Sequence, residues 1–250
     1  MPWQSNEQVE QDLVISRSLI LIFSDDWLAS SLAFRGGTAL HKLHLNPQAR
    51  YSEDIDLVQI RAEPIKETIV KLQAALSFLE KPSVKPKRDG VQMVFRFNSE
   101  FPPTVPLKLK VEINTREHFA TLGFKKFPFE VNSGWFIGRC DLTTYCTEEL
   151  LGTKLRALYQ RRKGRDLFDL YQALHSGMLI NSDAVLECYR HYMSISSGRP
   201  PSCREFLMNI DNKMADPEFL GDTVALLRPE VQYAPQDAYL KVRGELIDKI

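Results

Sequence analysis

The sequence has few cysteines, and none of them forms a pair with metal-binding spacing. Only four occur in 250 residues, and no two are separated as Cys-x-x-Cys; they are Cys140, Cys146, Cys188 and Cys203. A structural zinc site or a disulfide framework needs cysteines at close or regular spacings. The pattern therefore argues against both kinds of site and predicts four buried thiols.

Long apolar runs are also missing. No uninterrupted apolar segment approaches the roughly 18 residues that span a bilayer. The first seven residues, Met-Pro-Trp-Gln-Ser-Asn-Glu, lack the basic and apolar regions of a secretory signal. We therefore expect a cytoplasmic protein with no membrane partner.

The chain has no excess of charge of either sign. Its 32 basic and 32 acidic residues give a formal net charge of zero, so no overall field draws in a polyanion, and a nucleic acid would have to meet local basic patches. Basic clusters occur at 81–88, 125–126 and 161–165, each either solvated surface or a substrate contact. With 44% hydrophobic and 26% charged residues, the composition is that of a globular chain with one large domain or two small ones.

A glycine-rich turn stands out near residue 36. Gly36 and Gly37 allow positive φ and let the backbone approach a ligand closely. Thr38 suits a helix N-cap, so the positive end of a helix would lie just behind the glycines, where an anion is favoured. The turn therefore predicts a phosphate-binding site.

Two aspartates follow in a segment of strand character. Asp54 and Asp56 are two residues apart, and the period of a strand places both carboxylates on one face. Aligned carboxylates repel each other unless a cation lies between them, and hard oxygen ligands suit Mg²⁺ or Mn²⁺ that also binds substrate phosphates. Either motif alone is also typical of an ordinary loop or a solvated strand edge. Together, with Arg50 and Ser52 just upstream, they predict a nucleotide site.

These two motifs resemble a known family. The run Gly-Gly-Thr-Ala-Leu at 36–40, followed by Arg-x-Ser-x-Asp-Ile-Asp-Leu at 50–57, is similar to nucleotidyltransferases of the AbiEii/AbiGii toxin group, relatives of the MenT toxins. The wider superfamily has Ser where this chain has Thr38, and a shorter interval to the aspartates. Both departures fit the toxin branch, and the resemblance extends to about Tyr171.

A second motif lies on a predicted amphipathic helix that begins near Thr147. Lys154 stands there among apolar residues, where a lysine either extends its ammonium to solvent or points into a cleft. The run Lys-x-x-Ala-Leu-x-x-Arg-x-x-x-Arg-Asp-x-x-Asp at 154–169 matches the family's downstream motif. The resemblance implies that Lys154 and Asp166 belong to the active site. We expect Gly164 to end or kink this helix and Asp166 to cap the next one.

The resemblance also implies a third acidic residue on a neighbouring strand, which would complete the metal site or act as general base. Strict alternation over 107–114 places Lys108, Lys110 and Glu112 on the polar face of a strand, so Glu112 is the candidate by position. An exposed glutamate paired with a lysine on the adjacent strand explains the same pattern equally well.

The periodicities predict an α+β fold, which the resemblance identifies as the nucleotidyltransferase fold: a mixed sheet with flanking helices, followed by a helical C-terminal domain. Apolar spacing predicts helices over 7–23 and from 65 to Pro82, and strands at 91–97 and 107–114 that pair across Pro102-Pro103. We expect a catalytic domain at 1–146 and a helical domain at 147–250 that closes the nucleotide cleft.

The expected function is transfer of a nucleoside monophosphate from an NTP to an acceptor hydroxyl, with Mg²⁺ bound by Asp54 and Asp56. The expected nucleotide-binding residues are Gly36, Gly37, Thr38, Arg50, Ser52, Lys154 and Arg161. The expected catalytic residues are Asp54, Asp56, Glu112, Lys154 and Asp166.

The resemblance implies an RNA acceptor, with the 3′ end of tRNA as the first candidate, and an antitoxin partner. Two alternatives stay open: modification of a protein hydroxyl, and a non-catalytic nucleotide-binding relative. Retention of two mutually repelling carboxylates argues against the second.

Overall fold

The computed structural model describes residues 3–250, and the chain divides into two compact units. The first consists of the described residues up to Ala39 together with Tyr51–Tyr145, and the second of Leu40–Arg50 together with Cys146–Ile250. The segment Leu40–Arg50 thus belongs to the same unit as the C-terminal helices, although it precedes the aspartate pair in the sequence.

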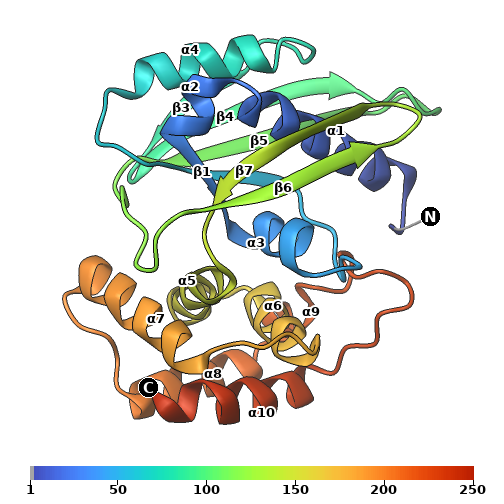
Figure 1. The fold of residues 1–250 in the computed structure, drawn as a ribbon. Helices are drawn as coiled ribbons and strands as arrows, with labels where there is room; N and C mark the ends of the chain where they lie inside the picture. Colours follow the sequence, from blue (N-terminus) through green and yellow to red (C-terminus); the bar gives the residue numbers. More distant parts are fainter. Residues whose placement is uncertain (1–2) are drawn as a thin grey trace. The chain divides into compact units, whose positions relative to one another are not determined.

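The first unit contains a seven-stranded mixed sheet, visible in Figure 1, with the strand order β3-β4-β5-β2-β1-β7-β6. Strand β2 pairs in parallel with β5, and β1 pairs in parallel with β7, while the remaining neighbours are antiparallel. The strands are β1 Leu32–Arg35, β2 Asp54–Gln59, β3 Ser83–Lys87, β4 Gly90–Asn98, β5 Pro106–Asn114, β6 Lys125–Asn132 and β7 Ile137–Thr144. The α+β prediction is confirmed.

Helices α1, α2 and α4 contact one another, and α1 also packs on the sheet. They are α1 Asn6–Phe23, α2 Asp26–Ser31 and α4 Ile65–Ala75; a short helix, α3 Gly36–Ala39, follows β1. Alternation explains the packing: Met93, Phe95, Leu109, Val111 and Ile113 are all at most 1% exposed, whereas the residues between them are not buried. One face of β4 and β5 therefore joins the core, and the other stays accessible.

The predicted hairpin is confirmed, since β4 and β5 pair along their whole length with Val91 opposite Ile113. The predicted helix after residue 65 ends earlier than expected, at Ala75, and Leu79 is buried in the turn that follows. Sequence analysis missed β3, which contains Pro86. Proline removes a backbone donor, and β3 tolerates it because it lies at an edge of the sheet.

The second unit is helical. Its elements are the π-helix η1 Leu40–His44, then α5 Thr147–Gln160, α6 Gly164–His175, α7 Ser182–Ser197, α8 Cys203–Met214, α9 Pro217–Gly221, α10 Pro235–Glu245 and the 3₁₀ helix η2 Ile247–Lys249. Helices α5 and α7 approach closely at Gly152, where an added Cβ would lie 2.6 Å from Cys188 Cβ. Gly164 begins α6 and does not end α5, contrary to the sequence prediction, because α5 has already stopped at Gln160.

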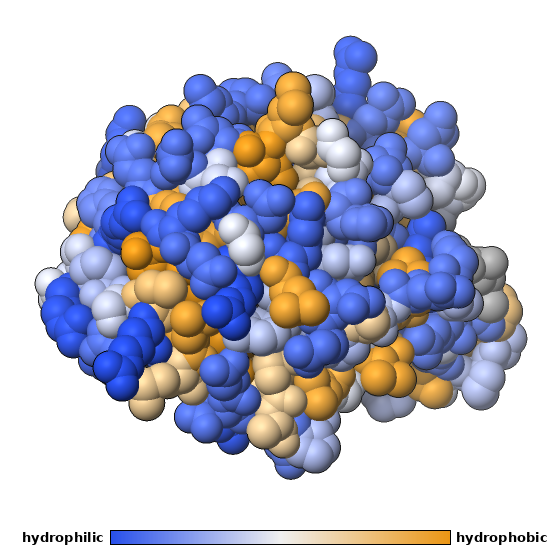
Figure 2. Space-filling view, turned by 90° about the horizontal axis from the view of Figure 1, so that it is seen from below, coloured by the Kyte–Doolittle hydropathy of each residue, from blue (hydrophilic) through white to orange (hydrophobic). Residues whose placement is uncertain are grey.

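Hydrophobic side chains on the face seen in Figure 2 are interspersed with hydrophilic ones. Among residues 3–250, no helix combines the length and apolar character needed to cross a bilayer. All four cysteines are free, but only Cys188 is buried, so the prediction of four buried thiols is wrong for the other three.

Candidate functional site

The accessible face of the sheet brings three predicted carboxylates together. Asp54 and Asp56 project from β2 on the face opposite the buried Ile55 and Leu57. Strand β5 runs parallel to β2 with Glu112 in register with Asp56. Side chains at such positions lie about 5 Å apart, so the pairing of β2 with β5 places the third acidic residue beside the aspartate pair.

Gly36 allows the backbone to pass close to one of these carboxylates. Its φ is +79°, and a Cβ built there would lie 2.2 Å from Asp56 Oδ2. A non-glycine residue would therefore be strained in the left-handed region and would also collide with the carboxylate. Gly36 is needed for the position of Asp56 as well as for the turn.

We expect Gly36→Ala to lower both stability and activity, because alanine must displace the Asp56 carboxylate. Gly123→Ala is the matched control: Gly123 has φ +78°, but an added Cβ would meet no atom within 4 Å. Both variants should lose about 1–2 kcal/mol of unfolding free energy to the left-handed backbone. Only Gly36→Ala should also lose nucleotide transfer, and equal activity of the two folded variants would contradict this account.

Thr38 positions the first aspartate through the backbone. Helix α3 begins at Gly36, so Thr38 lies within its first turn and is not the N-cap that the sequence predicted. Thr38 is 1% exposed, and its hydroxyl donates to the carbonyl oxygen of Asp54 at 2.5 Å and lies 2.7 Å from Ser52 Oγ. A carbonyl only accepts, so Ser52 donates to Thr38. The two hydroxyls thus fix the start of β2.

The negative charge of Asp54 is only partly neutralised, although a lysine lies close to it. Burial and the charges of Asp56 and Glu53 raise the pKa of Asp54 to about 6, although Lys110 opposes this shift. Lys110 Nζ lies 2.6 Å from Asp54 Oδ2 and 3.5 Å from Glu112 Oε1. The ammonium of one lysine therefore bridges two of the three carboxylates, and negative charge remains in excess.

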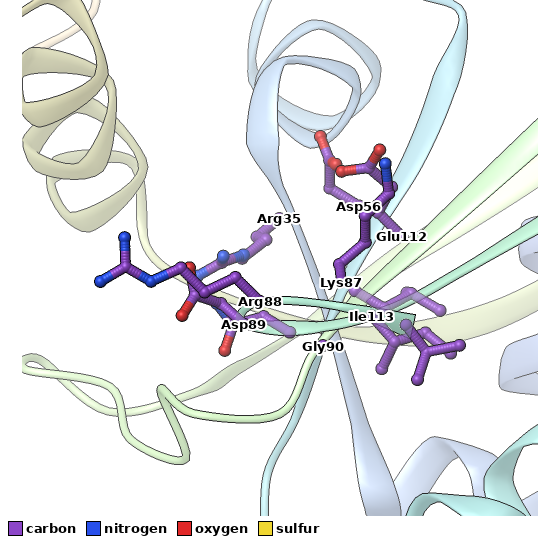
Figure 3. Close-up of a pocket in the computed structure, with 11 residues that line it drawn as sticks. Arg35, Asp56, Lys87, Arg88, Asp89, Gly90, Glu112 and Ile113 are labelled. Atoms are coloured by element: carbon purple, nitrogen blue, oxygen red, sulfur yellow. The ribbon is translucent and has the colours of Figure 1, made fainter. Parts of the chain in front are cut away.

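A pocket of about 350 Å³ opens beside Asp56 and Glu112 (Figure 3). Its basic residues are Arg35, Lys87 and Arg88, the last two from the end of β3 and the turn after it. Arg35 forms an ion pair with Glu117. Neither Lys87 nor Arg88 has an ion-pair partner within the described part of the chain. In Figure 3 Lys87 points toward Asp56 and Glu112, whereas Arg88 points away from them.

The donor set fits a divalent metal that shares its ligands with a substrate. No three acidic, histidine or cysteine side chains among residues 3–250 are grouped as a complete metal site. Mg²⁺ in phosphoryl-transfer sites is typically held by one or two carboxylates plus substrate phosphates and water. Two half-exposed aspartates on one strand, next to a pocket with free cations, meet that requirement.

The remaining predicted residues meet elsewhere, inside the second unit. Asp169 accepts two hydrogen bonds from the buried Arg50, at 2.6 and 2.7 Å from Nε and Nη2. Lys154 Nζ lies 2.9 Å from Asp169 and 3.1 Å from Asp166, and its side chain is 7% exposed. Arg161, whose side chain is 52% exposed, donates two hydrogen bonds to the buried Asp166. We call Arg50, Lys154, Arg161, Asp166 and Asp169 the interior ion cluster.

Charge balance in the interior ion cluster keeps its carboxylates ionised. Burial alone would raise the pKa of Asp169, but Arg50 and Lys154 outweigh it and hold that pKa well below its usual range. His41, whose Nε2 lies 2.8 Å from Asp169, has its pKa lowered to about 4, first by burial, so it is neutral. The sequence predicted that Asp166 caps α6, and this is wrong. Asp166 pairs with Lys154 and Arg161, and the N-cap residue of α6 is Lys163.

The structure thus divides the predicted residues into two groups. Gly36, Thr38 and Ser52 lie around the carboxylates of the first unit, and Gly37 is buried. In the second unit Lys154 and Arg161 pair with Asp166, and Arg50 pairs with Asp169. Sequence analysis assigned no role to Lys110 or Asp169, and it named Lys87 only as part of a basic cluster at 81–88 that is either solvated surface or a substrate contact. The alternation of β5 could have indicated Lys110, since it shares a strand face with Glu112.

Comparisons with known proteins identify the family and the fold. A family model described as the nucleotidyl transferase AbiEii toxin of a type IV toxin–antitoxin system matches residues 19–242. The solved structure of MenT4, a nucleotidyltransferase toxin from Mycobacterium tuberculosis H37Rv, matches with a TM-score of 0.69 and 16% identity, over 98% of this chain and 86% of its own. JHP933 from Helicobacter pylori matches with a TM-score of 0.60 and 17% identity, over 98% and 93%.

A search of curated protein sequences found no match. At identities this low, the structural matches show a shared fold only. The family model extends over most of the chain and includes both motifs described above.

Proposed function

Since this chain belongs to the AbiEii family of nucleotidyltransferase toxins of type IV toxin–antitoxin systems, we propose that Asp54 and Asp56 are its metal-binding aspartates. The proposed reaction moves a nucleoside monophosphate from an NTP to an acceptor hydroxyl. The observation that carries the proposal is the line of three carboxylates, Asp54, Asp56 and Glu112, on adjacent strands of one sheet face.

The pocket beside Asp56 is the proposed place for the triphosphate. Lys87 and Arg88 bring two cations that lack ion-pair partners in the described chain. A phosphate chain could supply the missing partners by accepting charge-assisted hydrogen bonds from both side chains. Gly36 leaves room for the approach, and Ser52 holds the strand that carries both aspartates.

The proposed chemistry is an in-line displacement. A hydroxyl oxygen of the acceptor forms a bond to the α-phosphorus, the bond to the bridging oxygen breaks, and pyrophosphate leaves. Asp54 and Asp56 would hold Mg²⁺ or Mn²⁺, which would neutralise charge on the phosphates and polarise the reacting oxygen. Glu112 lies in register with Asp56 and is proposed as the third acidic residue, which completes the metal site or takes the hydroxyl proton.

We propose RNA, with a tRNA 3′ end as the first candidate, as the acceptor, and a cognate antitoxin as the protein partner; the family resemblance supports both. Nucleotide binding by Lys154, Arg161 and Arg50 remains a prediction, as does a catalytic role for Lys154 and Asp166. In the structure each of them already has a partner of opposite charge.

The test is incubation of the protein with each α-labelled NTP, Mg²⁺, total RNA and total protein, followed by separation of the two acceptors. We expect label in RNA, at the 3′ end, and none when Mg²⁺ is chelated. Label in protein would favour the alternative acceptor. Absence of label from both, with correctly folded protein, would contradict the proposed function.

A further inference from the structure

A second pocket, of about 470 Å³, lies on the same sheet face beside Asp54. Its basic residues are Arg96 of β4 and Lys108 and Lys110 of β5; its acidic residues are Asp54 and Glu53. Each pocket therefore contains one aspartate of the pair, Asp56 in the first and Asp54 in the second. A transfer reaction needs two substrates on opposite sides of the reacting phosphorus, and two pockets flanking the carboxylates offer that geometry.

Arg96 and Lys108 form an unusual pair. They are direct partners in the antiparallel register of β4 and β5, where side chains lie about 5 Å apart and like charges destabilise the sheet. Neither residue has an ion-pair partner among residues 3–250, and both are exposed. Another row on the same face of this hairpin is different: Gln92, opposite Glu112, donates to it at 2.8 Å.

Lys110 connects this basic pair to the proposed metal site. It lies two residues beyond Lys108 on the same strand face, a rise of about 6.7 Å, and contacts Asp54 at 2.6 Å. A bound anion would offset the repulsion between Arg96 and Lys108, since no carboxylate among residues 3–250 lies within ion-pair distance of either. The chain has zero net charge, so such a local concentration of unpaired cations is what a polyanion would recognise.

We infer that Arg96 and Lys108 form a subsite for the phosphodiester backbone of a single-stranded RNA acceptor, next to Asp54. This inference rests on the proposed function and adds which side of the aspartate pair each substrate occupies. The NTP uses Lys87 and Arg88 on the Asp56 side, and the RNA strand uses Arg96 and Lys108 on the Asp54 side.

The test compares three double variants. Arg96→Gln with Lys108→Gln removes the subsite, and Lys87→Gln with Arg88→Gln removes the cations of the other pocket. Arg61→Gln with Lys66→Gln is the matched control, since both residues are exposed in the same unit, line neither pocket, and give the same change in net charge. Binding of a fluorescein-labelled single-stranded RNA oligonucleotide is followed by anisotropy without NTP, and KM is measured for NTP and RNA separately.

We expect the Arg96/Lys108 variant to bind RNA at least about tenfold more weakly than the control variant. Its plot of log affinity against log salt should be shallower by about 1.4, because each single-strand phosphate contact contributes about 0.7. KM for NTP should stay at the value of the control. The Lys87/Arg88 variant should instead raise KM for NTP and bind RNA as the control does.

RNA binding and KM for RNA equal to those of the control would overturn the inference while leaving the proposed function intact. Transfer to a protein acceptor with no affinity for the RNA probe would also overturn it. Loss of transfer in every protein, including the parent, would count against the proposed function, and the anisotropy measurement would still decide the RNA subsite.

Discussion

Replacing Asp56 by asparagine should reduce nucleotide transfer by about a thousandfold and leave the protein folded. The carboxylate is a proposed metal ligand, and metal-ion stabilisation of a phosphoryl transition state is worth several kcal/mol, with about 1.4 kcal/mol for each factor of ten. An amide of the same shape keeps the contact with Gly36 but is a much weaker ligand for Mg²⁺. The measurement is kcat for transfer at saturating NTP and Mg²⁺.

Stability should respond in a different way. Asp56 repels Asp54, which contributes to the raised pKa of Asp54, but it also attracts Arg35 and Lys110. These opposing effects on partly exposed groups should nearly cancel, so the unfolding free energy without Mg²⁺ should change by less than about 1 kcal/mol.

Asp89→Asn is the control for this prediction, because Asp89 lines the same pocket but is exposed and lies in the β3–β4 turn. It should retain most of the activity. An Asp56→Asn protein that unfolds easily yet still transfers nucleotide would make Asp56 a structural residue and remove the metal site from the proposal.

Local periodicity was enough to predict much of the first unit. A two-residue period placed Asp54 and Asp56 on one face and Glu112 on the polar face of its strand, and the structure agrees. The neighbour relation between β2 and β5 could not be predicted in the same way, because parallel strands pair across a long connection that no local pattern specifies. Glu112 therefore became a convincing neighbour of Asp56 only in the folded chain.

The strands β6 and β7 were missed for a related reason. Most residues of β6 are exposed or half-buried, and Pro128 interrupts its pattern, so no apolar alternation indicates a strand. Its pairing with β7 is visible only once the hairpin forms.

The sequence also could not show which charges neutralise one another. Arg50 and Asp169 are 119 residues apart and form a buried bidentate ion pair. A charged residue at a motif position has the same sequence pattern whether it meets a ligand or a buried partner. The predicted ligand and catalytic residues of the interior ion cluster are therefore the ones for which the tertiary structure adds most, because it gives each of them a partner of opposite charge.

Replacement of Lys154 by methionine tests whether the ion pairs of this lysine stabilise the second unit. Methionine keeps the apolar stem and suits a helix, so the change chiefly removes the ammonium between Asp166 and Asp169. Removing one partner of a buried ion pair is strongly destabilising, and each aspartate here keeps an arginine. We therefore expect a loss near the lower end of the usual range, about 3 kcal/mol, in urea unfolding.

Lys241→Met is the matched control, because Lys241 also pairs with a carboxylate in the second unit, Glu245, but both side chains are more than 40% exposed. An exposed pair of this kind is worth about 0.5 kcal/mol or less, so the control should unfold almost like the parent.

The sequence also predicted that Lys154 binds the nucleotide. This role is tested by titrating both variants with a non-hydrolysable NTP and Mg²⁺ at a temperature where both are folded. A direct contact with the triphosphate predicts a tenfold to hundredfold loss of affinity, since a charge-assisted hydrogen bond is worth roughly 1.5–3 kcal/mol. Lower stability with unchanged affinity would assign Lys154 to the interior ion cluster alone. If the two variants were equally stable, the ion pairs of Lys154 would not stabilise the second unit, and the lysine would be retained for its ligand.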